Sequence, residues 1–151
     1  MSVAERLAEL GLTLPPVAAP VAAYVPAVRT GSYVYTSGQL PVVGGKLAVT
    51  GLLGADVTAE EGYEQARIAG LNALAAVGSV VGLDDVVRVV KAVGYVASAP
   101  GFTGQPGVVN GASELFGAVF GDAGKHARSA VGVAVLPLNA PVEVELIVEL
   151  R

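Results

Sequence analysis

Residues 125–149 read KHARSAVGVAVLPLNAPVEVELIVE, and this stretch decides the fold because it predicts a β-hairpin. From Ala127 to Val135 the residues are small or β-branched apart from one arginine, and from Val142 to Leu150 apolar residues alternate largely with glutamates. A period of two is typical of a strand with one buried face. Between the two runs, Leu136 to Pro141 holds two prolines and an asparagine, which do not continue a central strand. The stretch therefore predicts two paired strands.

The register of this hairpin determines which side chains share a face. A two-residue turn at Leu136-Pro137 and a six-residue loop from Leu136 to Pro141 give the same parity. Both place one arginine and a strip of small residues on the face that carries two glutamates, namely Arg128, Ala130, Gly132, Ala134, Glu143 and Glu145. Both direct four apolar residues to the opposite, core-facing side, namely Val131, Val133, Val144 and Leu146.

This face offers a guanidinium beside very small residues. A guanidinium holds a carboxylate in a planar two-bond fork, and small neighbours leave room for a ligand against the backbone. The alternative is a solvated cross-strand pair between Arg128 and a glutamate, worth at most about 1 kcal/mol. The pattern of residues leaves both interpretations open.

The hairpin stretch, YTSGQLP at Tyr35 to Pro41 and VVNGASELF at Val108 to Phe116 together resemble the Rid family of reactive-intermediate imine deaminases, also called the YjgF or L-PSP endoribonuclease family. The resemblance runs from about Tyr24 to Glu149, and the A-R-S, L-P and E-x-E spacing of the hairpin is its most specific part. It implies an α+β, chorismate-mutase-like fold in which a mixed β-sheet carries two main helices on one face. It also implies a homotrimer with an active site in each cleft between subunits.

The activity implied by the resemblance is hydrolysis of 2-imino and 2-enamino acids to 2-keto acids and ammonia, without a metal or cofactor. Carried over by position, Arg128 binds the substrate carboxylate, while Glu143 and the backbone carbonyl of Ala130 hold the attacking water. The remaining pocket residues implied in this way are Tyr24, Ser37, Gly38 and Asn110. From pattern alone, an ordinary turn at Ser37-Gly38 and a local backbone bond from Asn110 are the alternatives.

This sequence departs from the family pattern in three respects. Position 130 is often Cys in the family and is Ala130 here, and the residue two before the arginine is commonly Pro and is His126 here. The chain also has an added N-terminal segment and a longer loop at Ser98 to Gly107. His126 is interpreted as a surface or loop histidine or, alternatively, as an acid or base near Arg128. Glu145 pairs either with Arg128 or with a neighbouring subunit.

Two other functions remain open. One is a trimeric module that binds small carboxylates such as keto acids without turnover. The other, RNA cleavage, ranks third, because the net charge is −4 and the nine basic residues are scattered, whereas nonspecific nucleic-acid binding needs clustered Lys and Arg. We therefore expect a small imino or keto acid and further copies of the chain as partners, and no nucleic acid.

Composition predicts one domain over residues 1–151, with an N-terminal helix and a proline-rich segment at 1–23 and a core at 24–151. Hydrophobic residues make up 53% and charged residues only 15%, which favours a surface covered by copies of the same chain. With no Cys and one His, neither a thiolate nucleophile nor a His/Cys metal site is expected. The N-terminus lacks the order of a signal peptide, and the uncharged run Ile68–Leu83 is shorter than the roughly 20 residues that span a bilayer, which favours a cytoplasmic protein.

The N-terminal half predicts two helices and a hairpin. Ser2 to Glu5 fits a capping box that opens a short helix, and Thr58 to Glu61 fits another that opens a long helix to about Val81. Between them, the prolines of Leu14 to Val28 predict an extended segment packed along the body, with a lid over a cleft as the alternative. Hairpin strands are expected at 24–28 and 33–36, and a turn at 44–46.

The second half predicts a central strand and a helix ahead of the hairpin. Val86 to Val96 is rich in β-branched residues, which is typical of a strand. After the loop, a helix is expected from about Pro106 to Gly121.

Overall fold

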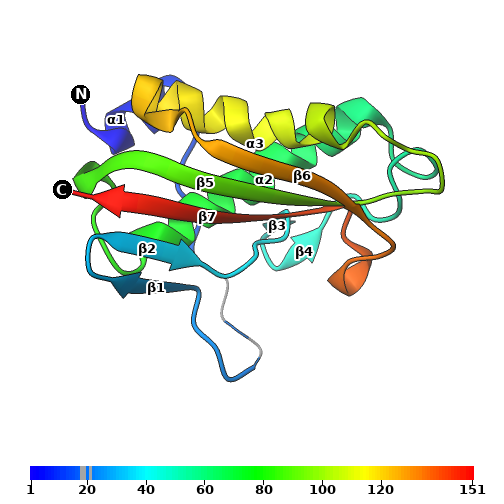
Figure 1. Cartoon of the computed structure of the whole chain (residues 1–151), viewed down its shortest axis with the longest axis horizontal. Helices are drawn as coiled ribbons and strands as arrows, with labels where there is room; N and C mark the ends of the chain where they lie inside the picture. Colours follow the sequence, from blue (N-terminus) through cyan, green and yellow to red (C-terminus); the bar gives the residue numbers. More distant parts are fainter. Residues whose placement is uncertain (18–19, 21) are drawn as a thin grey trace.

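The computed structural model describes residues 1–17, 20 and 22–151 (Figure 1). Its α-helices are α1 (Val3–Glu9), α2 (Ala59–Gly78) and α3 (Gln105–Phe120), and its short 3-10 helices are η1 (Leu83–Asp85), η2 (Gly121–Gly124) and η3 (Pro137–Asn139). Its strands are β1 (Ala27–Thr30), β2 (Tyr33–Thr36), β3 (Val42–Val43), β4 (Lys46–Leu47), β5 (Val86–Ala97), β6 (Ala127–Val133) and β7 (Val142–Leu150).

Five strands form one mixed sheet in the order β1-β2-β7-β5-β6, and β3 pairs with β4 in a separate ribbon. Only β5 and β6 run parallel; the other neighbours in the large sheet are antiparallel. Helices α2 and α3 pack together and cover one face of this sheet, while the other face looks toward the reader in Figure 1. This is the α+β arrangement that the sequence predicts.

Capping boxes mark the starts of helices α1 and α2. The Thr58 hydroxyl accepts a hydrogen bond from the Glu61 backbone at 3.1 Å, and the Glu61 carboxylate accepts one from the Thr58 backbone at 3.2 Å. Ser2 and Glu5 make the same reciprocal pair at the start of α1. Each box satisfies two amides that a helix N-terminus leaves without partners. The predicted helix starts are confirmed.

Close packing between α2 and α3 depends on small residues. A Cβ atom at Gly111 would lie 1.9 Å from the Tyr63 carbonyl oxygen, so only glycine lets the two backbones approach this closely. The largest fully buried side chains of the core include Phe116, Leu53, Leu74, Leu115, Leu146 and Val34. This core joins the helices to the covered face of the sheet.

The predicted hairpin over residues 125–149 is wrong, although both of its strands exist. Strand β5 lies between β6 and β7, pairing in parallel with the first and antiparallel with the second. The alternating pattern identifies a strand and its buried face, but it contains no information on which neighbour the strand takes. At twelve residues β5 is the longest strand of the sheet, and it uses both of its edges.

The predicted sharing of faces changes with the pairing. Arg128 is in register with Ala92, which is in register with the buried Leu146, so Arg128 belongs to the helix-covered face. Glu143 and Glu145 lie opposite Tyr95 and Val93, on the open face. The expectation that Arg128, Ala130 and Gly132 share a face with the two glutamates is therefore wrong. Val144 and Leu146 are buried as predicted, whereas Val131 is 43% exposed and Val133 is only partly buried.

The first hairpin is confirmed, with β1 starting three residues later than predicted. Residues 18, 19 and 21 of the proline-rich segment lie outside the described residues, so its expected packing is described only in part. The described residues from Leu12 to Val17 have no regular secondary structure. Within the described part of the chain, none of the helices has the length and apolar character needed to cross a membrane.

Candidate functional site

Arg128 lies on β6, the edge strand beside α3 (Figure 1), and its guanidinium is held by two side chains of that helix. Its Nη1 atom donates to Asn110 Oδ1 at 2.7 Å and to Ser113 Oγ at 3.3 Å. Asn110 and Ser113 are three residues apart and so lie on the same face of α3. The Asn110 side chain therefore contacts Arg128, the residue predicted to bind the substrate carboxylate, instead of making a local backbone bond.

The positive charge of Arg128 has no carboxylate partner within the described residues. The ion pairs among them join Arg6 to Glu9 and Lys125 to Asp122, both exposed. The expected pairs of Arg128 with Glu143 or Glu145 do not form. In this same part of the chain, the Nε and Nη2 atoms of Arg128 donate to no protein atom, and those two atoms form one edge of the fork that binds carboxylates.

His126 joins this cluster through Ser113. Its Nε2 atom lies 2.9 Å from Ser113 Oγ, and its Nδ1 atom lies 2.6 Å from the Gly124 carbonyl oxygen. His126 lies in the loop between η2 and β6, as one of its two interpretations expects, and is partly buried, and its described hydrogen bonds go to Ser113 and Gly124. It reaches Arg128 through one hydroxyl.

A second cluster lies on β7 and at the end of β2. Gly38 packs against the Glu143 carboxylate, so that a Cβ atom at position 38 would lie 2.1 Å from Glu143 Oε1. The adjacent Ser37 donates its hydroxyl to the Val25 carbonyl at 2.6 Å. Backbone bonds between Gln39 and Val144, at 2.8 and 3.0 Å, fix the loop to β7. The structure thus brings Ser37, Gly38 and Glu143 together.

Tyr24 belongs to the edge of this second cluster. It directly precedes Val25, whose carbonyl accepts from Ser37, and its side chain is 51% exposed. The described contacts include no hydrogen bond from its hydroxyl to the protein. Tyr24 is therefore open to solvent or to another molecule.

The electrostatics of the second cluster raise the pKa of Glu143. Burial, followed by the neighbouring charge of Glu145, raises the pKa of the Glu143 carboxyl above its ordinary value of 4.5. Glu145 in turn accepts a hydrogen bond from the Tyr95 hydroxyl at 2.5 Å, which raises the pKa of Tyr95 to about 12. A raised pKa brings a carboxyl group closer to the range in which general acids and bases exchange protons in catalysis.

The two clusters are separated within one chain. Tyr95 on β5 is in register with Glu143 on β7 and with Val131 on β6. Glu143 therefore lies two strands across the sheet from β6, at the level of a residue three positions after Arg128. Strand spacing and rise give a Cα separation of about 14 Å, and the two side chains leave the sheet on opposite faces. Ala130 is on the Arg128 side, in register with Gly94. Within one copy of the chain, the Arg128 cluster and the Glu143 cluster are therefore two separate candidate half-sites.

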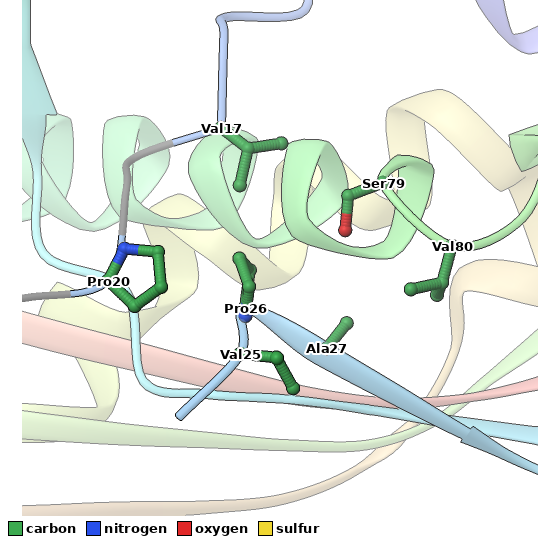
Figure 2. Close-up of a pocket in the computed structure, with 7 residues that line it drawn as sticks. All are labelled: Val17, Pro20, Val25, Pro26, Ala27, Ser79 and Val80. Carbon is green, nitrogen blue, oxygen red and sulfur yellow. The ribbon is translucent and has the colours of Figure 1, made fainter. Parts of the chain in front are cut away.

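Two hollows near the N-terminal segment contain none of the predicted site residues. The hollow in Figure 2, of about 440 Å³, lies between the proline-rich segment, the start of β1 and the end of α2, and its lining is apolar apart from Ser79. The other, of about 560 Å³, lies between α1 and η1. No group of three or more His, Cys, Asp or Glu side chains among the described residues is placed to hold a metal ion.

The comparison with protein families identifies this arrangement. Residues 4–150 match the family described as "YjgF/chorismate_mutase-like, putative endoribonuclease". The chain belongs to the YjgF family. The match covers almost the whole chain, so the predicted family and its fold are both confirmed.

Individual YjgF relatives show how far the similarity extends. Protein TCP17 of Trypanosoma cruzi is 49% identical, over 99% of this chain and 94% of its own length. The crystal structure of Atu1372 from Agrobacterium tumefaciens, a protein of unknown function, is 46% identical with a TM-score of 0.92, covering 99% of this chain and 92% of that one. E. coli TdcF with bound serine is 26% identical with a TM-score of 0.64, covering 91% and 94%.

Sequence reasoning missed two residues that the structure adds to the clusters. Ser113 follows Asn110 at helical spacing, and that spacing is a signal that predicts a shared face. Tyr95 belongs to the strand predicted over 86–96. Once one set of alternating residues in that strand is assigned to the core, Tyr95 falls in the other set, on the open face. Its contact with Glu145 depends on the pairing of β5 with β7, which the sequence does not reveal.

Proposed function

We propose that this protein hydrolyses 2-imino acids, and their 2-enamino tautomers, to 2-keto acids and ammonia, in sites that two copies of the chain build together. The observation that carries the proposal is the guanidinium of Arg128. It is anchored by two neutral acceptors, keeps its charge uncompensated by a carboxylate, and leaves its Nε and Nη2 atoms free within the described chain. An anchored cation of this kind is prepared for a planar anion.

A ligand with a carboxylate next to a nitrogen-bearing carbon fits this guanidinium. Serine, the ligand bound to E. coli TdcF, has that arrangement, as do 2-imino acids. The likeness supports the class of ligand, and the chemistry must come from another group. The strongest candidate for that group is Glu143.

In the proposed reaction, Glu143 moves a proton between water and the nitrogen of the substrate. The carboxylate accepts a proton from water as the water oxygen bonds to the carbon of the protonated imine, which gives a neutral tetrahedral carbinolamine. The same proton then passes to the nitrogen, the C–N bond breaks as the C=O bond of the keto acid forms, and the carboxylate takes the hydroxyl proton as ammonia leaves. Water and imino acid are consumed, and no oxidant, metal or covalent nucleophile is needed. The raised pKa of Glu143 suits both transfers.

A shared site follows from the separation of the two half-sites. Arg128 and Glu143 leave opposite faces of the sheet about 14 Å apart, so one ligand meets both only if they come from different copies. The open face offers a surface for such an assembly, because Val28, Tyr33, Tyr35 and Val131 are 41–52% exposed on it. We propose the homotrimer that the resemblance implies, with this face covered by neighbouring copies.

The test measures ammonia and keto-acid release from imino acids that an amino-acid oxidase generates in situ. Arg128→Ala is expected to reduce the accelerated rate by about 100-fold or more, because both the anchor and its charge are lost. Arg6→Ala is the matched control, since it removes an exposed arginine from a surface ion pair within α1. Equal rates for wild type and Arg128→Ala would remove the proposal.

The same protein samples distinguish imino-acid hydrolysis from two other functions. A module that binds carboxylates without turnover shows thermal stabilisation by a keto acid that Arg128→Ala abolishes, and no acceleration over the oxidase-only rate. Ribonuclease activity, which the family description names, is measured by incubation of the same samples with single-stranded RNA. We expect neither RNA retention nor cleavage, given the net charge of −4.

A further inference from the structure

The hydrogen bonds around Arg128 continue past its two direct partners into a chain whose directions are fixed by chemistry. A carbonyl oxygen only accepts, so Nδ1 of His126 donates to the Gly124 carbonyl. A guanidinium only donates, so Ser113 Oγ accepts from Arg128 Nη1. In neutral His126 the remaining nitrogen, Nε2, accepts, and the Ser113 hydroxyl donates to it. Each group in the chain thereby holds the next in one orientation.

The far end of this chain is fixed to the body of the protein. Gly124 packs on the backbone of α3, where a Cβ atom would lie 2.2 Å from the Phe116 carbonyl oxygen. The His126 ring stands edge-on to the Phe116 ring, with the centroids 5.6 Å apart at 75°. Phe116 is fully buried. The imidazole is thus held by a carbonyl, by a hydroxyl and by an aromatic ring of the core.

The near end of the chain sets the plane of the guanidinium. Asn110 alone gives Arg128 Nη1 one acceptor, and a single hydrogen bond leaves the guanidinium free to rotate about it. Ser113 provides a second acceptor for the same nitrogen, one helical turn further along α3. With both described contacts on Nη1, the Nε and Nη2 atoms keep their hydrogens for another partner. A serine hydroxyl rotates freely unless its own proton is bound, and His126 binds it.

We propose that His126 and Ser113 are positioning residues that hold Arg128 in the orientation in which it binds the carboxylate of a ligand. The inference rests on the proposed function, because it takes Arg128 as the residue that binds the carboxylate of the substrate. Its physical basis is preorganisation: an arginine held in its binding orientation loses less side-chain entropy on binding than a mobile one. The role concerns affinity for the carboxylate, and it is separate from the proton transfer at Glu143.

The experiment measures binding of 2-oxobutanoate by calorimetry, together with KM and kcat for imino-acid hydrolysis. Ser113→Ala removes the link, and His126→Phe keeps the packing on Phe116 while it removes both ring nitrogens. Each is expected to weaken 2-oxobutanoate binding and raise KM by about fivefold to tenfold, with kcat changed less than about twofold. Ser113→Thr and His126→Gln keep a hydroxyl and an acceptor, and are expected to stay within about twofold of wild type.

Arg128→Ala provides the background that separates positioning from general stability. In that background Ser113→Ala is expected to cause no further loss, because no guanidinium remains to be held. The inference is overturned if Ser113→Ala and His126→Phe bind like wild type, or if their loss persists undiminished without Arg128. Normal binding by Arg128→Ala would overturn both this inference and the proposed role of Arg128. Binding that depends on all three residues without any hydrolysis would contradict the proposed reaction and support the positioning role.

Discussion

The two half-sites of this protein are held by different kinds of contact. Side chains hold Arg128, through Asn110 and Ser113 on α3 and then through His126. The carboxylate of Glu143 instead lies against the backbone of Gly38, at a place where a single extra carbon would lie 2.1 Å from Oε1. A network of side chains can be weakened gradually by substitution, whereas a Cβ atom at position 38 would displace the Glu143 carboxylate in a single step. The half-sites should therefore respond differently to mutation.

Among variants that keep both Arg128 and Glu143, the largest effect is expected when a side chain is added at Gly38. Gly38→Ala places a Cβ atom where Glu143 Oε1 now lies, so the carboxylate must move by about 1 Å or more, which can lower kcat by about 100-fold. The measurement is kcat for hydrolysis of oxidase-generated imino acids, with thermal unfolding as the check on folding. Gly117→Ala is the matched control, because a Cβ atom there meets nothing within 4 Å and lies within α3. Wild-type kcat in Gly38→Ala would show that Glu143 is not the proton carrier.

A smaller effect is expected in the other half-site for Arg128→Lys. The charge remains, but the planar fork and the two contacts of Nη1 are lost, so KM for imino acids should rise by about tenfold while kcat falls little. Steady-state kinetics with Arg128→Ala for comparison make the measurement. A KM equal to that of wild type would mean that a positive charge alone is sufficient and that the network around Arg128 has no part in binding.

A change in pH dependence is expected from Glu145→Gln. Burial and then the charge of Glu145 raise the pKa of Glu143, so removing that charge lowers the pKa of Glu143 without returning it to the ordinary value. The deprotonated base then persists to lower pH, and the acid limb of the kcat/KM profile moves to lower pH. Glu114→Gln is the control for the loss of a tyrosine–carboxylate hydrogen bond, because Glu114 accepts from Tyr63 and follows Ser113 on α3, in the cluster that does not contain Glu143. A limb that stays in place would exclude Glu143 as the titrating group.

The smallest effect concerns stability. Since the folded state raises the pKa of Glu143, the ionised carboxylate destabilises the fold, and the penalty appears as the pH rises from 4.5 through the raised pKa. Glu143→Gln should therefore be more stable than wild type near neutral pH and should unfold at a higher denaturant concentration. The expected gain in the free energy of unfolding is less than about 1 kcal/mol after allowance for solvent screening. Below pH 4.5 the difference should vanish, because the group is protonated in both states. A less stable variant near neutral pH would contradict the assignment.

The sequence predicts local structure where local chemistry decides it. The capping boxes at Ser2 and Thr58 predict where helices begin, since their bonds lie within four residues of chain. The last hairpin is predicted wrongly because the neighbour of a strand depends on contacts across the whole molecule. A twelve-residue strand from an earlier part of the chain takes the place between β6 and β7.

The site follows the same division. Resemblance indicates Arg128, Asn110 and Glu143 as site residues, yet it says nothing of the bond from Arg128 to Asn110 or of the intermediary Ser113. The parity argument put Arg128 beside Glu143, and the true pairing puts them on opposite faces. That error is instructive, because the separation is the reason for proposing a site shared between copies.

Complementation between two inactive variants tests the shared site most directly. Arg128→Ala and Glu143→Gln are each expected to lack activity, and they are co-expressed with different tags or mixed, unfolded and refolded together. If each site takes Arg128 from one copy and Glu143 from another, random assembly restores both residues in about one site in four, and about a quarter of wild-type activity returns. A mixture as inactive as its components, although the tags show that mixed assemblies formed, would contradict a site built from two copies.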